Sequence, residues 1–287
     1  MVARALAAVG VAVLAAGCGS ASTGSGQTPA ASLKRAAYVS TSAPGYRAAM
    51  TMTETISGAS SGSKTIALTA NGSFSPASRV GDMTMAMQIP TAAGTQNFNM
   101  QLVLEGDTIY VKMPAALASK LPGDKPWFSM NLAQMGKASG IPGYGSLLSS
   151  SSNFSNPSQY LDLLRATADG SVKDLGQETI DGVQTTHYQA QVDIAKLPNV
   201  VPAADRQAAQ QLVSTLQSKG VNTQMPVDTW IDGSHRIRRI HITYSLSLQG
   251  ESVAVDITEN LSDYGSQPAP TAPSADETTN LLSLIHG

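Results

Sequence analysis

The sequence predicts an α+β fold, in which a single strongly curved antiparallel sheet of about ten or eleven strands has helices packed on one side. Three observations lead to this prediction. Apolar and polar residues alternate with a period of two through most of the chain after residue 45, which is typical of strands with one buried face. Turn-forming Gly, Ser, Asn and Asp separate these runs. Because open sheets of about ten strands curl or split, one strongly curved sheet is the simplest arrangement.

The first residues of the chain are typical of a secretory leader that ends at the single cysteine. Arg4 supplies a positive charge, and an uncharged apolar run of about 12 residues follows it. Such a run is too short to span a bilayer as a helix. Small residues ending in a Gly-Cys pair resemble a bacterial lipobox, with Ala15 in the place where Leu is usual. We expect a lipoprotein signal peptide over residues 1–17 and lipidation of Cys18. The alternative is an ordinary secretory signal with an incidental cysteine.

The rest of the chain divides into a tether, one domain and a tail. Residues 18–30 are rich in Gly, Ser and Thr, which predicts a flexible tether. Residues 31–264 are expected to form one domain, since no change of charge or composition marks a boundary; two stacked domains divided near Ser150 are the alternative. Residues 265–287 begin with a Pro-rich stretch and end in a short apolar segment. This segment is expected either to fray or to dock on the domain as a short helix.

One helix and a run of strands are expected in the first half of the domain. Residues 30–41 can form a short helix with Leu33 and Ala37 on its inner face. Apolar residues then occupy every second position, and a Glu-Gly-Asp turn leads into the last strand of the run. The strands expected from this alternation cover residues 46–53, 65–70, 82–88, 97–104 and 109–113.

The second half of the domain repeats this organisation after a break. Between residues 114 and 168 the alternation is lost, with a helical turn or two at 131–139. Asn156 as N-cap and Pro157 at the first helical position then predict a helix. A clearer amphipathic helix is expected over residues 203–219, where a following Gly can cap its C-terminus. The strands expected here cover residues 172–179, 188–194, 225–232, 240–248 and 253–257.

Composition excludes several classes of function. The chain has 287 residues, a net charge of -2 and only 13% charged residues, whereas nucleic-acid binders need a basic patch or stripe. A single cysteine excludes an intramolecular disulfide and a multi-cysteine metal cluster. We therefore expect no nucleic-acid partner and no cofactor.

No run of residues predicts catalysis or metal binding. Ser60 stands in a G-x-S-x-G string, but that motif acts at a strand-to-helix turn and here it lies between two strand-like runs. The four histidines lack H-x-x-x-H spacing, and His187 and His241 fall on the polar, solvent-facing positions of their strands. The basic cluster at 235–239 is interpreted as a solvated hairpin, in preference to a patch for anionic lipid headgroups. We expect that the protein has no catalytic residue and no metal ligand and that it is not an enzyme.

Methionine is concentrated on the expected strand faces of the first half of the domain. Seven of the 11 Met fall within residues 50–113. Met side chains are flexible and polarizable and are frequent on surfaces that adapt to variable apolar partners. A sheet face lined by them would accommodate acyl chains, and a gap-filling core beneath helices is the alternative. The residues expected to line a lipid-binding cavity are Met50, Met52, Ile66, Leu68, Met83, Met85, Met87, Phe98, Met100, Leu102 and Leu104.

Several strings occur in a recognisable order. After the lipobox and the tether, the chain contains LEGDTIYVKMP, KPWFSM, PSQYLDLLRA, DGVQTTHYQAQVDI and PVDTWIDGSHRIRRIHI. Together they resemble the actinobacterial envelope lipoproteins of the LppX/LprA/LprF/LprG type, within the wider LolA/LolB-like group. The resemblance covers residues 31–264 and rests on pattern and order. No catalytic signature defines that group.

The resemblance implies a half-barrel sheet with helices covering its concave face and an apolar cavity between them. It also implies a function in binding or carrying lipids or lipoglycans in the cell envelope, on the extracytoplasmic side of the cell membrane and with an envelope transporter as a further partner. An interaction module on the same fold, which holds a partner protein or reports envelope stress, is the alternative function.

Overall fold

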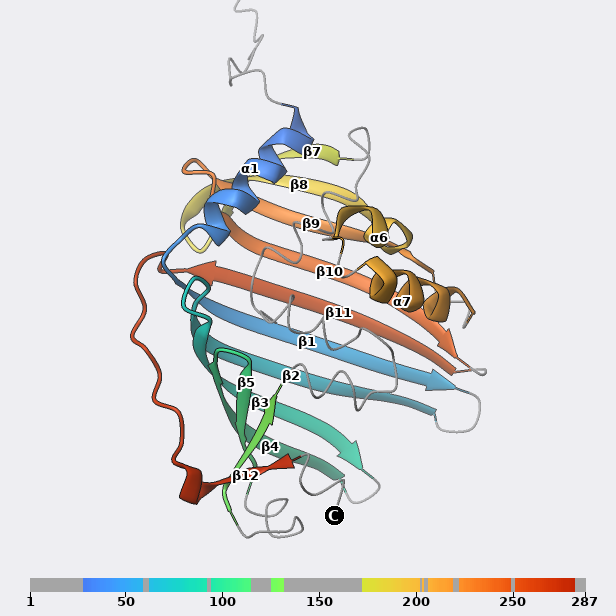
Figure 1. Cartoon of the computed structure of the whole chain (residues 1–287). Coiled ribbons are helices and arrows are strands. Elements are labelled where there is room, and N and C mark those ends of the chain that lie inside the picture. The colour runs from blue at the N-terminus through green and yellow to red at the C-terminus, as the bar shows by residue number, and fades with distance from the viewer. Residues whose placement is uncertain are drawn as a thin grey trace, which may run out of the picture.

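Twelve strands and three α-helices are described in the computed structural model, which covers residues 28–58, 62–91, 94–114, 125–131, 172–201, 203, 206–218, 222–248 and 251–281 (Figure 1). The strands are β1 Tyr46–Gly58, β2 Gly62–Ser75, β3 Val80–Thr91, β4 Gly94–Glu105, β5 Thr108–Lys112, β6 Trp127–Asn131, β7 Val172–Ile180, β8 Val183–Asp193, β9 Gln224–Asp232, β10 Ile237–Leu248, β11 Glu251–Ser262 and β12 Thr278–Asn280. The helices are α1 Pro29–Thr41, α6 Leu197–Val200 and α7 Arg206–Ser218.

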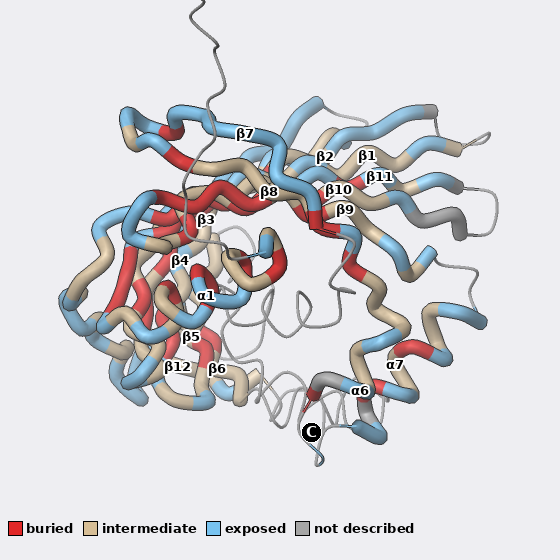
Figure 2. The backbone as a smooth tube through the Cα atoms, turned by 90° about the horizontal axis from the view of Figure 1, so that it is seen from above, coloured by how far each residue is buried: buried red, intermediate tan, exposed pale blue. Residues whose placement is uncertain are grey.

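All twelve strands belong to one sheet, in the order β12-β6-β5-β4-β3-β2-β1-β11-β10-β9-β8-β7. The two meanders of the chain meet in the middle, where residues 47–58 of β1 pair with residues 251–262 of β11. Described neighbours in the sheet are antiparallel, apart from the parallel pair of β12 with β6. The sheet curves strongly, and the helices lie on its inner side (Figure 2). The predicted α+β fold with one curved antiparallel sheet is confirmed.

Each of the ten expected strands corresponds to an observed strand, and most are longer than expected. The polar residues at the adjoining ends of β1 and β2 predict a turn, yet the pairing of the two strands continues to Gly58 and Gly62. Another turn forms as expected. Asp181 and Gly182 join β7 to β8 with φ angles of 48° and 80°, the two positive values that a tight type I′ hairpin turn requires.

Two strands were not expected from the sequence. Residues 127–131 form β6 within the segment that lacks alternation, and residues 278–280 form β12, so the frayed or helical end expected there is wrong for these residues. In β6 the adjacent apolar residues Trp127 and Phe128 interrupt the alternation, and the three residues of β12 are too few to show it. The Lys125 ammonium fixes the tail beside β6 by donating to the carbonyls of Ala275 and Thr278 at 3.0 Å each.

Helix α1 closes one end of the concave side. Thr28 caps its N-terminus by accepting from the Ala31 backbone N–H, and Leu33 is buried against the sheet. The Ser40 hydroxyl at the other end of the helix accepts from the Ile237 backbone N–H at 2.9 Å. That bond lies where the register of β10 against β9 shifts. Ser40 thus satisfies a buried donor at an irregular point in the strand pairing.

Candidate functional site

The eleven residues predicted to line a cavity come together on the concave face of β1 to β4. Residues directly opposite each other in antiparallel strands project to the same face. One such row across the four strands consists of Met52, Leu68, Met87 and Phe98, and the next consists of Met50, Ala70, Met85 and Met100. Leu102 pairs with Met83. Ile66 and Leu104 lie two residues from Leu68 and Leu102 along their strands, so their side chains project to the same face. The structure therefore brings these side chains together, and their contact with a lipid stays a prediction.

Burial of this apolar face is graded along the strands. At the end beside α1 the side chains are buried, and Tyr46 has no exposed area. Toward the far end of β1 to β4 the same face becomes half-buried, and Glu54, Lys64 and Gln96 join its apolar side chains there. Of the predicted residues, Leu68, Met83 and Leu104 are buried. The half-buried ones are Met50, Met52, Ile66, Met85, Met87, Phe98, Met100 and Leu102.

Aromatic rings close the buried end. The ring of Tyr46 lies 6.1 Å from that of Phe74 and 6.0 Å from that of Tyr264, centre to centre. The Tyr264 hydroxyl donates to the Ile237 carbonyl, and burial raises the pKa of this phenol. Gly81 is opposite Phe74 in the pairing of β2 with β3, where a Cβ would overlap the Phe74 ring. The concave face thus has one closed end and one less buried end.

A buried carboxyl group also belongs to this face. Glu259 of β11 is directly opposite Met50 of β1 and Ile240 of β10, and its exposed fraction is 4%. No hydrogen-bond or ion-pair partner of this carboxyl is found among the described residues, and its charge acts on the nearby Tyr264 phenol. Burial raises the pKa of Glu259 to about 8, because a carboxylate without water or a counter-ion is disfavoured.

A hydroxyl group in the same row is also unpaired. Thr229 of β9 is directly opposite Ile240 on the side away from Glu259. Its exposed fraction is 1%, and its Oγ1 has no hydrogen-bond partner among the described residues. Sequence reasoning missed both groups. The alternation at Val253, Val255 and Ile257 would have placed Glu259 on the apolar face had it been extended by one step.

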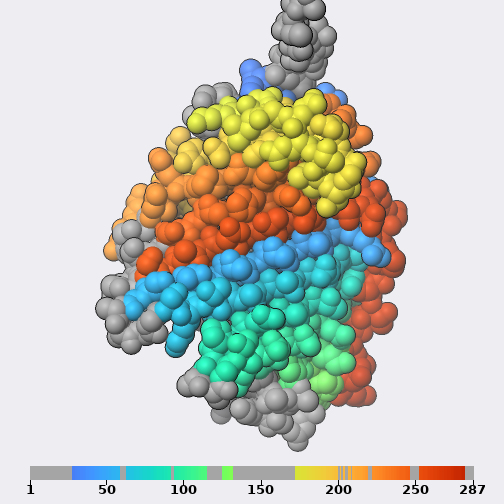
Figure 3. Space-filling view, turned by 180° about the vertical axis from the view of Figure 1, so that it is seen from behind, coloured from blue at the N-terminus to red at the C-terminus, as the bar shows by residue number. Residues whose placement is uncertain are grey.

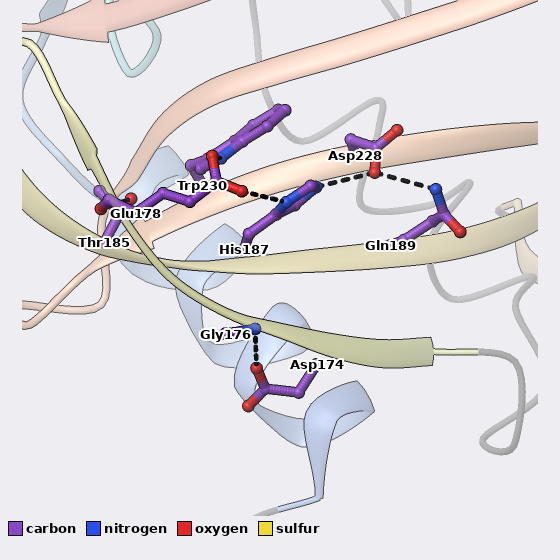
Figure 4. A network of polar contacts seen from close by, with 8 residues as sticks. All are labelled: Asp174, Gly176, Glu178, Thr185, His187, Gln189, Asp228 and Trp230. Carbon is purple, nitrogen blue, oxygen red and sulfur yellow. Dashed lines mark hydrogen bonds and ion pairs between the residues drawn. The ribbon is translucent and has the colours of Figure 1, made fainter.

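A polar cluster occupies the opposite, convex face of β7 to β9 (Figure 4). His187 lies between two carboxylates, with Nδ1 2.9 Å from Glu178 Oε1 and Nε2 2.8 Å from Asp228 Oδ1. Trp230 stacks on the His187 ring at 4.1 Å, and its indole N–H donates to Glu178 at 2.8 Å. That hydrogen bond, together with the one from His187, lowers the pKa of Glu178.

This cluster joins three strands. Both ring nitrogens of His187 already face carboxylates, so the imidazole has no free nitrogen for a substrate or a metal ion. The prediction that His187 faces solvent is wrong in one respect, because its side chain is only 13% exposed although it lies on the polar face. The cause is the stacked Trp230, which its own strand brings to the same face.

The arginines of the predicted basic cluster each have a partner within the domain. Arg238 Nε donates to Asp232 at 2.6 Å, and Arg239 Nε donates to Asn260 at 2.6 Å. Arg236 and Arg238 also lie over the Tyr264 ring. These contacts favour the hairpin interpretation over a surface patch for anionic headgroups.

The outer surface of the sheet carries shallow hollows (Figure 3). Two of them, of about 400 and 460 Å³, are lined by Thr and Asn residues together with apolar ones such as Met100 and Val255. Small-molecule sites are usually well-formed concave pockets. Because these hollows are shallow, they are weaker candidates than the concave face.

Metal-binding and membrane-spanning features were sought in the described part of the chain. No group of three or more His, Cys, Asp and Glu in that part could hold a metal ion. None of the helices described there is long and apolar enough to cross a membrane. Cys18, Ser60 and the helix expected at Asn156 lie outside the described residues.

Comparison with known proteins finds one relative by sequence. No family model matches the chain. The relative is an uncharacterized 31.2 kDa protein of Streptomyces griseus, encoded in the rplA–rplJ intergenic region, and the two are 29% identical over 184 residues. The match spans 62% of this chain and 55% of the relative, so this chain aligns with about half of that protein.

Comparison of structures finds LprF of Mycobacterium bovis, with 14% identity and a TM-score of 0.45 over 86% of this chain and 97% of LprF. It also finds the lipoprotein LppX of Mycobacterium tuberculosis, with 14% identity and a TM-score of 0.38 over 85% of this chain and 98% of LppX. LprF and LppX are two members of the group that the sequence strings resemble.

Proposed function

We propose that the protein binds acyl chains of a lipid or lipoglycan on the concave face of its sheet. The observation that carries this proposal is the graded burial of that face, whose eleven predicted lining residues are apolar, which is closed by aromatic rings beside α1 and which is only half-buried toward the other end. Apolar area that remains half-buried inside a curved sheet suits an apolar ligand.

The chemistry of the lining suits chains of variable shape. Four Met side chains, Met50, Met52, Met85 and Met87, pack partly buried against the core. Each methylene that leaves water for such a surface contributes about 0.8 kcal/mol. Flexible thioether side chains can follow a bent or branched chain without a fixed pocket shape. Binding of this kind needs no catalytic residue and no cofactor.

The proposal includes attachment of the domain to the membrane through the leader and the tether. Lipidation at Cys18, after removal of residues 1–17, would hold the domain of residues 31–264 outside the cytoplasmic membrane by the tether of residues 18–30. A chain bound on the concave face could then be carried within the envelope or passed to a transporter.

Mass spectrometry of lipids that co-purify with the full chain tests this function. The protein is made in an actinobacterial host, extracted in a mild detergent and compared with an unrelated lipoprotein purified in the same way. We expect one acylated lipid class at close to one molecule per protein. Absence of any enriched lipid, together with a protein partner in stoichiometric amount, would instead support the interaction module.

A further inference from the structure

The row that contains Glu259 crosses the boundary between the two parts of the concave face. Thr229, Ile240, Glu259 and Met50 are successive partners in β9, β10, β11 and β1. Leu261, two residues beyond Glu259 toward α1, is buried, Met50 beside Glu259 and Ile257 on its other side are half-buried, and Val255 further along β11 is buried again. A ligand lying on the half-buried part would therefore end next to the Glu259 carboxyl.

The two unpaired groups lie within reach of one ligand head. Neighbouring strands are about 4.8 Å apart, so the backbones at Glu259 and Thr229 are about 10 Å apart with Ile240 between them. The long Glu side chain shortens this gap. Buried polar side chains almost always have hydrogen-bond partners, so the Thr229 hydroxyl, which has none among the described residues, and the buried Glu259 carboxyl in the same row require an explanation.

The chemistry of the row selects an uncharged, oxygen-bearing head. The residues directly paired with Glu259 and Thr229 are Met50, Ile240 and Tyr188, none of which carries a charge. A charged headgroup buried there would lack a counter-ion. A carboxylic acid kept neutral by an apolar environment donates a hydrogen bond, and a threonine hydroxyl both donates and accepts.

We propose that Glu259 and Thr229 hydrogen-bond the ester and hydroxyl oxygens of a neutral acylglycerol whose acyl chain lies along the Met-lined face. This inference rests on the proposed function and names its ligand class. It assigns binding specificity to two residues of β11 and β9, outside the set of residues that line the face in β1 to β4.

A pair of photoactivatable probes tests this assignment on the full chain in detergent. One probe is a monoacylglycerol with a diazirine in its acyl chain, and the other is a hydrocarbon of equal length with the same diazirine and no head. Half-saturating concentrations are measured for the wild type, Glu259→Leu, Glu259→Gln and Thr229→Val. Glu259→Gln serves as the matched variant, because its amide keeps the size of the side chain and a hydrogen-bond donor.

We expect Glu259→Leu to weaken binding of the monoacylglycerol at least tenfold and to leave that of the hydrocarbon within about twofold. Thr229→Val should weaken the monoacylglycerol alone by about fivefold, and Glu259→Gln should retain most of the affinity. Equal affinity of wild type and Glu259→Leu for both probes would overturn the assignment while leaving acyl binding intact. If the wild type binds neither probe, the proposed function fails as well.

Discussion

At the scale of single residues, a polar side chain at an apolar position of a strand has a large effect on the free energy of folding. Glu259 continues an alternation of apolar residues, and its burial beside Met50 and Ile240 raises its pKa to about 8. Burying a carboxyl group without a partner costs free energy of folding, since the group loses its hydration. A residue that destabilises the fold and lies on the proposed binding face is a candidate for function.

Replacing Glu259 by Gln should flatten the dependence of stability on pH. The folded pKa of about 8 exceeds the unfolded value of 4.5, so between these values the folded state binds more protons than the unfolded state. Stability of the wild type should then fall as the pH rises above 4.5 and level off above 8, by up to about 5 kcal/mol in total. Urea unfolding at pH 5 and pH 9 measures this fall. A wild type with the same pH profile as Glu259→Gln would show that the carboxyl is not buried in solution.

Substitutions at Met85 and Ala86 test whether the ligand binds the concave face of the sheet or the convex face. Met85→Gln places an amide on the half-buried apolar face, whereas Ala86→Gln places the same amide at the adjacent exposed position of β3. The first change should weaken acyl-probe binding by roughly tenfold, the cost of losing one to two buried methylenes and of removing a polar amide from water. The second should leave it unchanged. Equal affinities for the two variants would place the ligand elsewhere.

At the scale of elements, one buried hydrogen bond adds to the apolar packing that holds α1 on the sheet. Ser40 is fully buried and accepts from the Ile237 backbone N–H at the register shift of β10. The hydrogen bond replaces one that regular strand pairing would have supplied. Such a bond between elements distant in sequence cannot be predicted from the alternation of either segment.

Ser40→Ala should destabilise the fold by about 1–3 kcal/mol, because the Ile237 N–H would be buried without an acceptor. Ser42→Ala is the matched control, since Ser42 is exposed at the end of the same helix. Thermal unfolding of both variants measures the difference. A Ser40→Ala variant as stable as Ser42→Ala would mean that α1 does not depend on this bond.

The pairing of β12 with β6 should depend on Lys125 far more than the pairing of the other strands does. Its ammonium donates to the carbonyls of Ala275 and Thr278, whereas β12 itself is only three residues long. Lys125→Ala should increase hydrogen exchange of the Thr278–Asn280 amides at least tenfold without lowering the midpoint of global unfolding, because β12 is an edge strand. Lys173→Ala, an exposed lysine of the opposite edge strand β7, is the control. Unchanged exchange in Lys125→Ala would show that backbone pairing alone holds β12.

At the scale of the whole molecule, one sheet joins the two halves of the chain through β1 and β11. The N-terminal helix lies inside the curve of the sheet (Figure 2). The strand register places all predicted lining residues on one face. A leader that ends at Cys18 would suspend this body from a membrane by the tether of residues 18–30.

Cys18→Ala should move the protein from the membrane fraction to the soluble fraction or the medium, since two or three acyl chains on this cysteine would supply the anchor. Ser20→Ala, a change two residues further on, should leave the protein in the membrane fraction. Fractionation of the expressing host with immunodetection measures both. Membrane retention of Cys18→Ala would contradict the lipobox interpretation.

Local patterns determined a large part of this structure. Alternation with a period of two defined ten strands and the parity of their side chains, since the pleat places every second side chain on one face. For that reason the residues from Met50 to Leu104 could be assigned to a common face before their partners were known. Turn residues such as Asp181 and Gly182 marked strand ends, because few residues tolerate positive φ.

Only the tertiary structure decided which strands are neighbours and which residues each side chain contacts. The pairing of β1 with β11 and of β6 with β12 joins segments more than 100 residues apart, and no local pattern encodes such partners. The burial of Glu259 and Thr229 depends on the strands beside them, which supply Met50, Ile240 and Tyr188 as direct partners. Sequence alone thus determined the faces of the strands, because pleat and turn chemistry act over a few residues. Tertiary structure decided burial and partnership, because both depend on contacts between segments far apart in the chain.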